Sequence, residues 1–173
     1  MRGRHSVWHG FIAAALIVSW CSVALADGWT TYVNPRFGTT AEVPLGGFTA
    51  DRPPENGDGQ SWTSTDGKGR ISAYGSYLVV ADTLQGYREF SLNTARKDGV
   101  TITYSAAGGT WFAYSGTQGS VIVYMKALLS KDCDPPVVHH VYLQYPAAQR
   151  KRYDAIVRRM AKSLRAGRVG DCN

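Results

Sequence analysis

The distribution of apolar and polar residues over the middle of the chain predicts short β-strands separated by tight turns. Residues 100–105 alternate strictly, which puts Val100, Ile102 and Tyr104 on one face and hydroxyl side chains on the other. Glycine pairs and an Asp-Gly sequence interrupt the pattern, as is usual in β-hairpins. We expect strands over residues 39–45, 60–65, 70–74, 100–105, 110–115, 120–129 and 137–145. The three strands between 100 and 129 follow one another on tight turns, which predicts an antiparallel meander.

Two segments have the apolar spacing of an amphipathic helix. The clearer one follows Pro146 and places six apolar residues on one stripe: Tyr153, Ile156, Val157, Met160, Ala161 and Leu164. The other runs from an N-cap at Asp82 or Thr83 to about Arg96, with a looser stripe. This order of elements predicts an α+β fold, in which two main helices, one of them the C-terminal amphipathic helix, pack on an antiparallel sheet.

The first 26 residues have the parts of a secretory signal peptide. Arg2 and Arg4 precede an apolar run over residues 11–23, and Ala24-Leu25-Ala26 is a small-x-small cleavage site. As a helix this run spans only about 20 Å, less than the roughly 30 Å of a bilayer core. We therefore expect cleavage after this site and one mature domain over residues 27–173, in the periplasm or the medium. The alternative is an uncleaved membrane anchor.

The mature chain would keep two of the three cysteines, Cys133 and Cys172. Two cysteines in an oxidising compartment most simply form one disulfide, which would tie down the C-terminal tail. The alternative is a pair of free thiols. The sequence has no Cys-x-x-Cys, which argues against thioredoxin-like chemistry.

The positive charge of the chain is concentrated in the C-terminal helix. Lys and Arg number 19 against 13 Asp and Glu, a formal net charge of +6 in a composition that is otherwise ordinary for a globular protein. Residues 150–168 contain a dense run of basic residues with Asp154 as their one acid. A candidate surface for an anionic glycan or lipid is therefore formed by Arg150, Lys151, Arg152, Arg158 and Arg159. The alternative is a solvated outer helix face, and export argues against nucleic acid.

Few residues suited to catalysis remain after removal of the leader. The two remaining histidines, His139 and His140, are adjacent on a predicted strand, so they point to opposite faces and cannot readily bind one metal. Metalloprotease, zinc-type and Gly-x-Ser-x-Gly motifs are absent from the sequence. We therefore predict no catalytic residue, metal site or cofactor. The alternative is a cell-envelope hydrolase with a carboxylate pair drawn from Asp51, Glu55, Asp58 and Asp66, a segment whose Asn-Gly and Asp-Gly sequences are also typical of turns.

Aromatic residues near turns are the remaining candidates for a binding site. Trp111 and Phe112 are consecutive on a predicted strand, so one of the two rings is expected outside the core. An exposed ring beside hydroxyl groups could stack on a sugar or a hydrophobic partner, unless helices cover both faces of the sheet. The predicted binding region comprises Trp62, Trp111, Tyr114, Ser115 and Gly116.

The turns contain a set of glycine and aromatic motifs. They are Asn34-Pro35-Arg36-Phe37-Gly38, Pro54-Glu55-Asn56-Gly57-Asp58-Gly59, Asp66-Gly67, Tyr74-Gly75, Ser115-Gly116 and Tyr145-Pro146. This set resembles that of a group of small uncharacterised secreted proteins of Gram-negative bacteria, and the layout is similar to PsbP-like and DcrB-like α/β/α sandwiches. Members of that fold class are mostly non-catalytic accessory or assembly proteins. The resemblance implies an exported, non-enzymatic binding or accessory domain for a partner protein, a small ligand or an envelope component.

Overall fold

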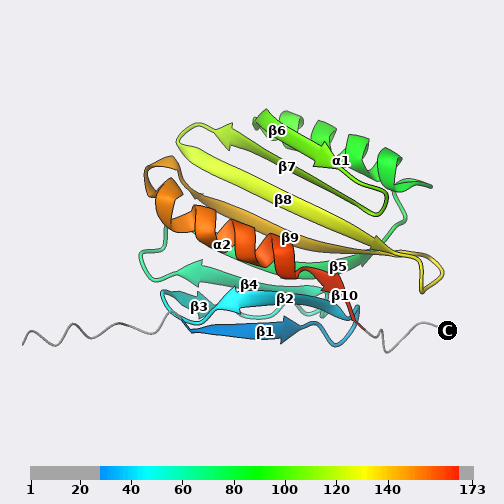
Figure 1. Cartoon of the computed structure of the whole chain (residues 1–173), viewed down its shortest axis with the longest axis horizontal. Coiled ribbons are helices and arrows are strands. Elements are labelled where there is room, and N and C mark those ends of the chain that lie inside the picture. Colours follow the sequence, from blue (N-terminus) through cyan, green and yellow to red (C-terminus); the bar gives the residue numbers. More distant parts are fainter. Residues whose placement is uncertain (1–27, 168–173) are drawn as a thin grey trace, which may run out of the picture.

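The computed structural model describes residues 28–167, which form two β-sheets and two α-helices (Figure 1). In chain order the elements are β1 (Trp29–Val33), β2 (Thr39–Pro44), β3 (Phe48–Ala50), β4 (Gly59–Ser64), β5 (Arg70–Tyr77), α1 (Leu84–Lys97), β6 (Thr101–Ala107), β7 (Trp111–Gln118), β8 (Val121–Ser130), β9 (Val137–Pro146), the 3-10 turn η1 (Ala147–Gln149), α2 (Arg150–Ser163) and β10 (Arg165–Ala166). The predicted α+β class, with an antiparallel sheet and two main helices, is confirmed. The predicted signal peptide and Cys172 lie outside the described residues.

The larger sheet has seven strands in the order β3-β4-β5-β9-β8-β7-β6, all paired antiparallel. Strands β6 to β9 are successive neighbours, so the predicted meander is confirmed and continues into a fourth strand. β9 then pairs with β5, which joins the meander to the β4–β5 hairpin. This long-range pairing brings two halves of the chain into one sheet.

One face of the large sheet, here called the α2 face, is covered by α2 and by the smaller sheet β1-β2-β10 (Figure 1). Its core includes Ile71, Val141 and Leu143 from the sheet, which are fully buried. Tyr153 and Met160 of α2 pack into the same cluster and are also fully buried. The apolar stripe that predicted this helix therefore faces the sheet.

The opposite face, here called the α1 face, is covered only in part. Thr83 is the N-cap of α1, and its side chain accepts a hydrogen bond from the backbone N–H of Gly86. Leu92 and Ala95 of the helix are buried in a cluster with Phe112 of β7. Because α1 lies over β6 and β7, the same face of β9 and β5 extends beyond the helix (Figure 1).

The predicted orientation of Tyr104 is wrong. The register pairs Ile102 with Gly116 but Tyr104 with Ser115, so a β-bulge takes up one residue between them. The extra residue reverses the alternation, and Tyr104 therefore lies on the face opposite to Ile102. Its side chain is 52% exposed. A sequence that alternates strictly does not reveal the bulge.

Three short strands of the structure were not predicted from the sequence: β1, β3 and β10. β10 has two residues and pairs with β2, where Arg165 lies opposite Thr40. It forms because α2 ends at Ser163 and Leu164 adopts an extended conformation. No helix within residues 28–167 is long and apolar enough to cross a membrane.

Candidate functional site

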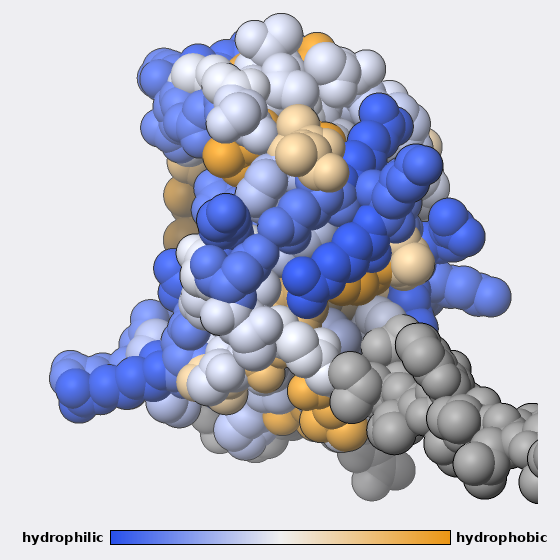
Figure 2. All heavy atoms as spheres, turned by 90° about the vertical axis from the view of Figure 1, so that its left-hand side faces the viewer, coloured by the Kyte–Doolittle hydropathy of each residue, from blue (hydrophilic) through white to orange (hydrophobic). Residues whose placement is uncertain are grey.

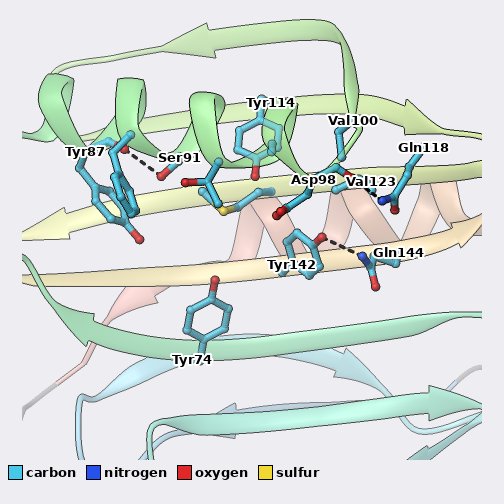
Figure 3. Close-up of a pocket in the computed structure, with 14 residues that line it drawn as sticks. Tyr74, Tyr87, Ser91, Asp98, Val100, Tyr114, Gln118, Val123, Tyr142 and Gln144 are labelled. Carbon is cyan, nitrogen blue, oxygen red and sulfur yellow. Dashed lines mark hydrogen bonds between the residues drawn. The ribbon is translucent and has the colours of Figure 1, made fainter. Parts of the chain in front are cut away.

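A cavity of about 480 Å³ lies between α1 and the part of the sheet that α1 leaves open (Figure 3). This volume is within the range of small-ligand sites. Four tyrosines from four different elements line the cavity: Tyr74 of β5, Tyr87 of α1, Tyr114 of β7 and Tyr142 of β9. We call it the tyrosine pocket.

Cross-strand register places three of these tyrosines on one face of the sheet. Tyr114 lies opposite Met125 of β8, and Met125 lies opposite Tyr142 of β9. Tyr74 lies opposite His140, two residues before Tyr142. Residues that face each other on antiparallel strands project to the same side of the sheet, so all three rings reach the α1 face.

Two of the tyrosine hydroxyls point into the pocket and are not used by the fold. Figure 3 shows Tyr114 reaching in from the α1 side and Tyr74 reaching in from the opposite side. Within residues 28–167 neither hydroxyl has a hydrogen-bond partner, whereas the Tyr142 hydroxyl accepts from Gln144 Nε2 at 2.9 Å. Burial raises the pKa of both Tyr74 and Tyr114, so both keep a proton to donate.

Asp98 is the only charged residue among the fourteen drawn in Figure 3, and none of these is a histidine. It is the C-cap of α1, and its carboxylate forms no ion pair in the described part of the chain. Burial is the main cause that raises the pKa of Tyr114 and of Tyr142, and the Asp98 carboxylate adds to both shifts. The charge therefore acts on the hydroxyls that line the pocket.

The floor of the pocket is apolar. Val100, Val123 and Met125 line it from the sheet side, and Phe90 of α1 lies at its margin with 47% of its surface exposed. The pocket thus combines an apolar floor, several hydroxyls and one carboxylate. This combination suits a small organic ligand with an apolar body and a polar group.

The two histidines are buried on opposite faces of β9, as predicted. His139 Nδ1 lies 2.8 Å from Thr39 Oγ1, and burial lowers the pKa of this histidine to about 4. His140 Nε2 lies 2.9 Å from the Tyr87 hydroxyl, and burial lowers its pKa to about 3. Both rings are therefore neutral at neutral pH, and each has a structural partner.

The structure does not bring the five residues of the predicted aromatic region together. Trp62 packs edge-on against Tyr32 under the smaller sheet, with ring centroids 5.2 Å apart. Trp111 and Ser115 lie on the α2 face, whereas Tyr114 and Gly116 lie on the α1 face. Phe112 is buried and Trp111 is half-buried, so one ring of that pair does lie outside the core. Of the five residues, only Tyr114 lines the tyrosine pocket.

Three of the five basic residues predicted on α2 have partners, two of them in other parts of the fold and one within α2 itself. Arg159 donates to both oxygens of Glu42, at 2.9 and 3.2 Å. Arg152 lies over the Phe48 ring, and Arg150 lies 3.7 Å from Asp154. Lys151 and Arg158 are the two of these five residues that are exposed and have neither an ion pair nor an aromatic ring partner in the described chain. Hydrophilic residues dominate the end of the molecule where α2 begins, with small hydrophobic patches between them (Figure 2).

The acidic residues of the possible hydrolase site are Asp51, Glu55, Asp58 and Asp66, and three of them have separate structural partners. Asp58 accepts from Arg36 at 2.6 Å, and Asp51 lies 3.3 Å from Arg70. The Ser64 hydroxyl is the first of several donors that hold the pKa of Asp66 well below its usual range. Within the described residues, no three His, Cys, Asp or Glu are arranged to hold a metal ion.

No protein-family profile matches the sequence, and the search of curated proteins finds no match. The solved structures that share the fold include the following two. The cyanobacterial PsbP protein (CyanoP) of Synechocystis superposes with a TM-score of 0.58 at 10% identity, over 86% of this chain and 98% of its own. The Ran-binding protein Mog1p of Saccharomyces cerevisiae superposes with a TM-score of 0.56 at 12% identity, over 82% of this chain and 96% of its own. The predicted PsbP-like fold is therefore confirmed.

Proposed function

We propose that this protein is an exported, non-enzymatic domain that binds a small ligand in the tyrosine pocket. One observation carries the proposal: the hydroxyls of Tyr74 and Tyr114 point into a cavity where the described chain offers them no hydrogen-bond partner. Neither hydroxyl is sealed off from water, so each can exchange a bound water for a polar group of a ligand that enters the cavity. A ligand with hydrogen-bonding groups would satisfy both.

The residues of the site favour binding over catalysis. The nearest histidine, His140, is held between Tyr74 and Tyr87, and burial lowers its pKa to about 3, which makes it too weakly basic to serve well as a general base in the pocket. The carboxylates of the hydrolase alternative serve ion pairs and turns instead. Mog1p, which shares the fold, is described as a Ran-binding protein, and this supports a binding role at the level of fold class.

The exported location is the remaining part of the proposal, and its support comes from the sequence. The leader over residues 1–26 and the resemblance to secreted proteins of Gram-negative bacteria support a periplasmic or extracellular location. In that compartment a disulfide between Cys133 and Cys172 would attach the C-terminal tail to the domain. Cys133 is buried against Phe37 and Val137, so its end of the crosslink would lie in rigid structure.

A second candidate function is electrostatic attachment to an anionic glycan or lipid through α2. Lys151 and Arg158 support it, because both are exposed and neither forms an ion pair within residues 28–167. Such attachment would hold the domain at the envelope and leave the tyrosine pocket open.

A thermal-shift screen of small polar metabolites against the mature protein tests the main proposal. We expect hits that lose most of their shift in the Tyr74→Phe/Tyr114→Phe double variant, which keeps both rings and removes both hydroxyls. The matched control is Tyr104→Phe, because Tyr104 is exposed on the other face of the sheet. A screen without hits, or hits that the double variant binds as well as the wild type, would contradict binding in this pocket.

A further inference from the structure

We infer that the ligand of the tyrosine pocket is a small organic cation whose ammonium group pairs with the Asp98 carboxylate. The inference rests on the proposed function and adds the chemical class of the ligand. It depends on three features: the charge of the lining, the position of Asp98 on α1, and the arrangement of hydroxyls around an apolar floor.

The lining of the pocket carries one negative charge and no positive one. Asp98 is the single charged residue among the fourteen that line it, and no Lys, Arg or His is among them. The carboxylate also lacks an ion pair anywhere in residues 28–167. An anionic ligand would meet this charge without a counter-charge, whereas a cation would supply one.

The position of Asp98 strengthens this argument. As the C-cap of α1, it lies at the negative end of the helix dipole, where an acidic side chain is unfavourable. The two residues directly before it, Arg96 and Lys97, are basic, as is usual in the last turn of a helix, but neither of them lines the pocket. Within the lining of the pocket, the exposed Asp98 carboxylate and the C-terminal end of the helix are therefore both sources of negative potential. A cation in the pocket would be attracted by both.

The remaining groups define the body of the ligand. The hydroxyls of Tyr74 and Tyr114 face the cavity, and the Asp98 carboxylate extends toward it from the end of α1 (Figure 3). The amide of Gln118 donates to the backbone carbonyl of Asp98, which holds this end of the helix in place. Val123 and Met125 offer an apolar floor beside the charge. An ammonium group on a compact ring or short chain matches this layout.

The inference can be tested with two probes of equal size, phenethylammonium chloride and 2-phenylethanol. Binding is measured by NMR titration of ¹⁵N-labelled mature protein at low salt. The variants are Asp98→Asn and, as the matched control, Asp82→Asn, which changes an exposed aspartate just before the N-terminus of the same helix. We expect the ammonium probe to shift pocket amides and to bind about tenfold more tightly than the alcohol. Asp98→Asn should abolish that preference and Asp82→Asn should keep it.

Two results would overturn the inference. One is equal affinity for the two probes that Asp98→Asn does not alter, and the other is no shift of pocket amides by the ammonium probe. Neither result decides the proposed function, because that function depends on the two tyrosine hydroxyls and on a screen that includes neutral compounds. A neutral ligand lost in the Tyr74→Phe/Tyr114→Phe variant would leave a binding domain with a different ligand class.

Discussion

The ring of His140 stacks on the ring of Tyr74, with centroids 4.4 Å apart and planes inclined by 14°. The same imidazole meets the Tyr87 hydroxyl through Nε2 at 2.9 Å. One fully buried side chain thus contacts two of the tyrosines that line the pocket, one on the sheet and one on α1. Protonation of His140 would therefore disturb two pocket tyrosines and would also change the free energy of unfolding.

Acid should destabilise the protein through its two histidines. Burial lowers the pKa of His139 to about 4 and of His140 to about 3, whereas an unfolded histidine titrates near 6.5. The unfolded chain therefore binds more protons below about pH 6.5, and the free energy of unfolding should fall as the pH drops from there toward 4. Urea unfolding at a series of pH values measures this slope.

His140→Gln is the matched variant for the acid prediction. It removes one of the two titrating groups, so the dependence of unfolding free energy on pH between 6.5 and 4 should become shallower even if the variant is less stable at every pH. An unchanged slope would show that His140 does not titrate differently in the folded and unfolded chain.

Asp98→Asn should stabilise the ligand-free protein slightly. The substitution removes a negative charge from the C-terminal end of α1 that has no ion-pair partner in residues 28–167. Relief from the helix dipole is worth about 0.5 kcal/mol in unfolding free energy. Urea denaturation with Asp82→Asn as the control measures the difference. A loss of stability would mean that the carboxylate is needed by the fold itself.

Tyr153→Phe should be neutral or stabilising, although the residue is fully buried. Its ring stacks on Tyr145 with centroids 4.4 Å apart, but its hydroxyl is buried without a hydrogen-bond partner in the described structure. Replacing an unsatisfied buried hydroxyl by hydrogen should raise the unfolding free energy by about 1 kcal/mol. Thermal unfolding measures the change, and a clear loss of stability would indicate a partner such as a buried water.

Gly69→Ala should have the opposite effect on stability, because Gly69 lies against Tyr153. A Cβ atom on Gly69 would overlap the Tyr153 hydroxyl and ring. We expect this substitution to destabilise the domain by about 1–3 kcal/mol, the usual cost of overpacking. The penalty should be smaller in the Tyr153→Phe background, because part of the overlap involves the hydroxyl oxygen. Additive effects in the double variant would contradict the close approach of these two residues.

If α2 attaches the domain to anionic surfaces, the Lys151→Glu/Arg158→Glu variant should lose retention on vesicles that contain phosphatidylglycerol. Retention of the wild type should also weaken as salt is added. Arg159 is left unchanged, because it pairs with Glu42 and lies 4.3 Å from the Trp29 ring. Equal retention of variant and wild type, or no retention of the wild type, would remove this second function.

Export and the disulfide can be checked in one measurement of intact mass. The full chain is expressed with its leader in a Gram-negative host, and the protein is recovered from the periplasm. We expect a mature chain that begins at Asp27 and has lost two hydrogens through the Cys133–Cys172 disulfide. In the chain-entropy view, reduction should then cost roughly 3–4 kcal/mol of stability. A chain that retains the leader, or two free thiols, would contradict the respective prediction.

Local patterns in the sequence predicted most of the regular structure. The stripe from Tyr153 to Leu164 buries Tyr153, Ile156 and Met160, because a period of 3.6 residues aligns them on one helix face. Period two placed His139 and His140 on opposite faces of β9 for the same kind of local reason. The sequence did not reveal the short strands β1, β3 and β10, which are too brief to show a period.

The tyrosine pocket could be found only from the tertiary structure. Tyr74 and Tyr142 line the same cavity because β5 pairs with β9 across the α1 and meander segments, and no local pattern encodes which strands become neighbours. In the sequence, Asp98 has the pattern of a turn residue after a helix. Only the packing of α1 on the sheet places it beside the tyrosine hydroxyls of the pocket. The sequence by itself determined which side chains share a face of most elements, with β6 and its bulge at Tyr104 as the exception. Long-range pairing, driven by burial of apolar faces against one another, decided which of those faces enclose a site.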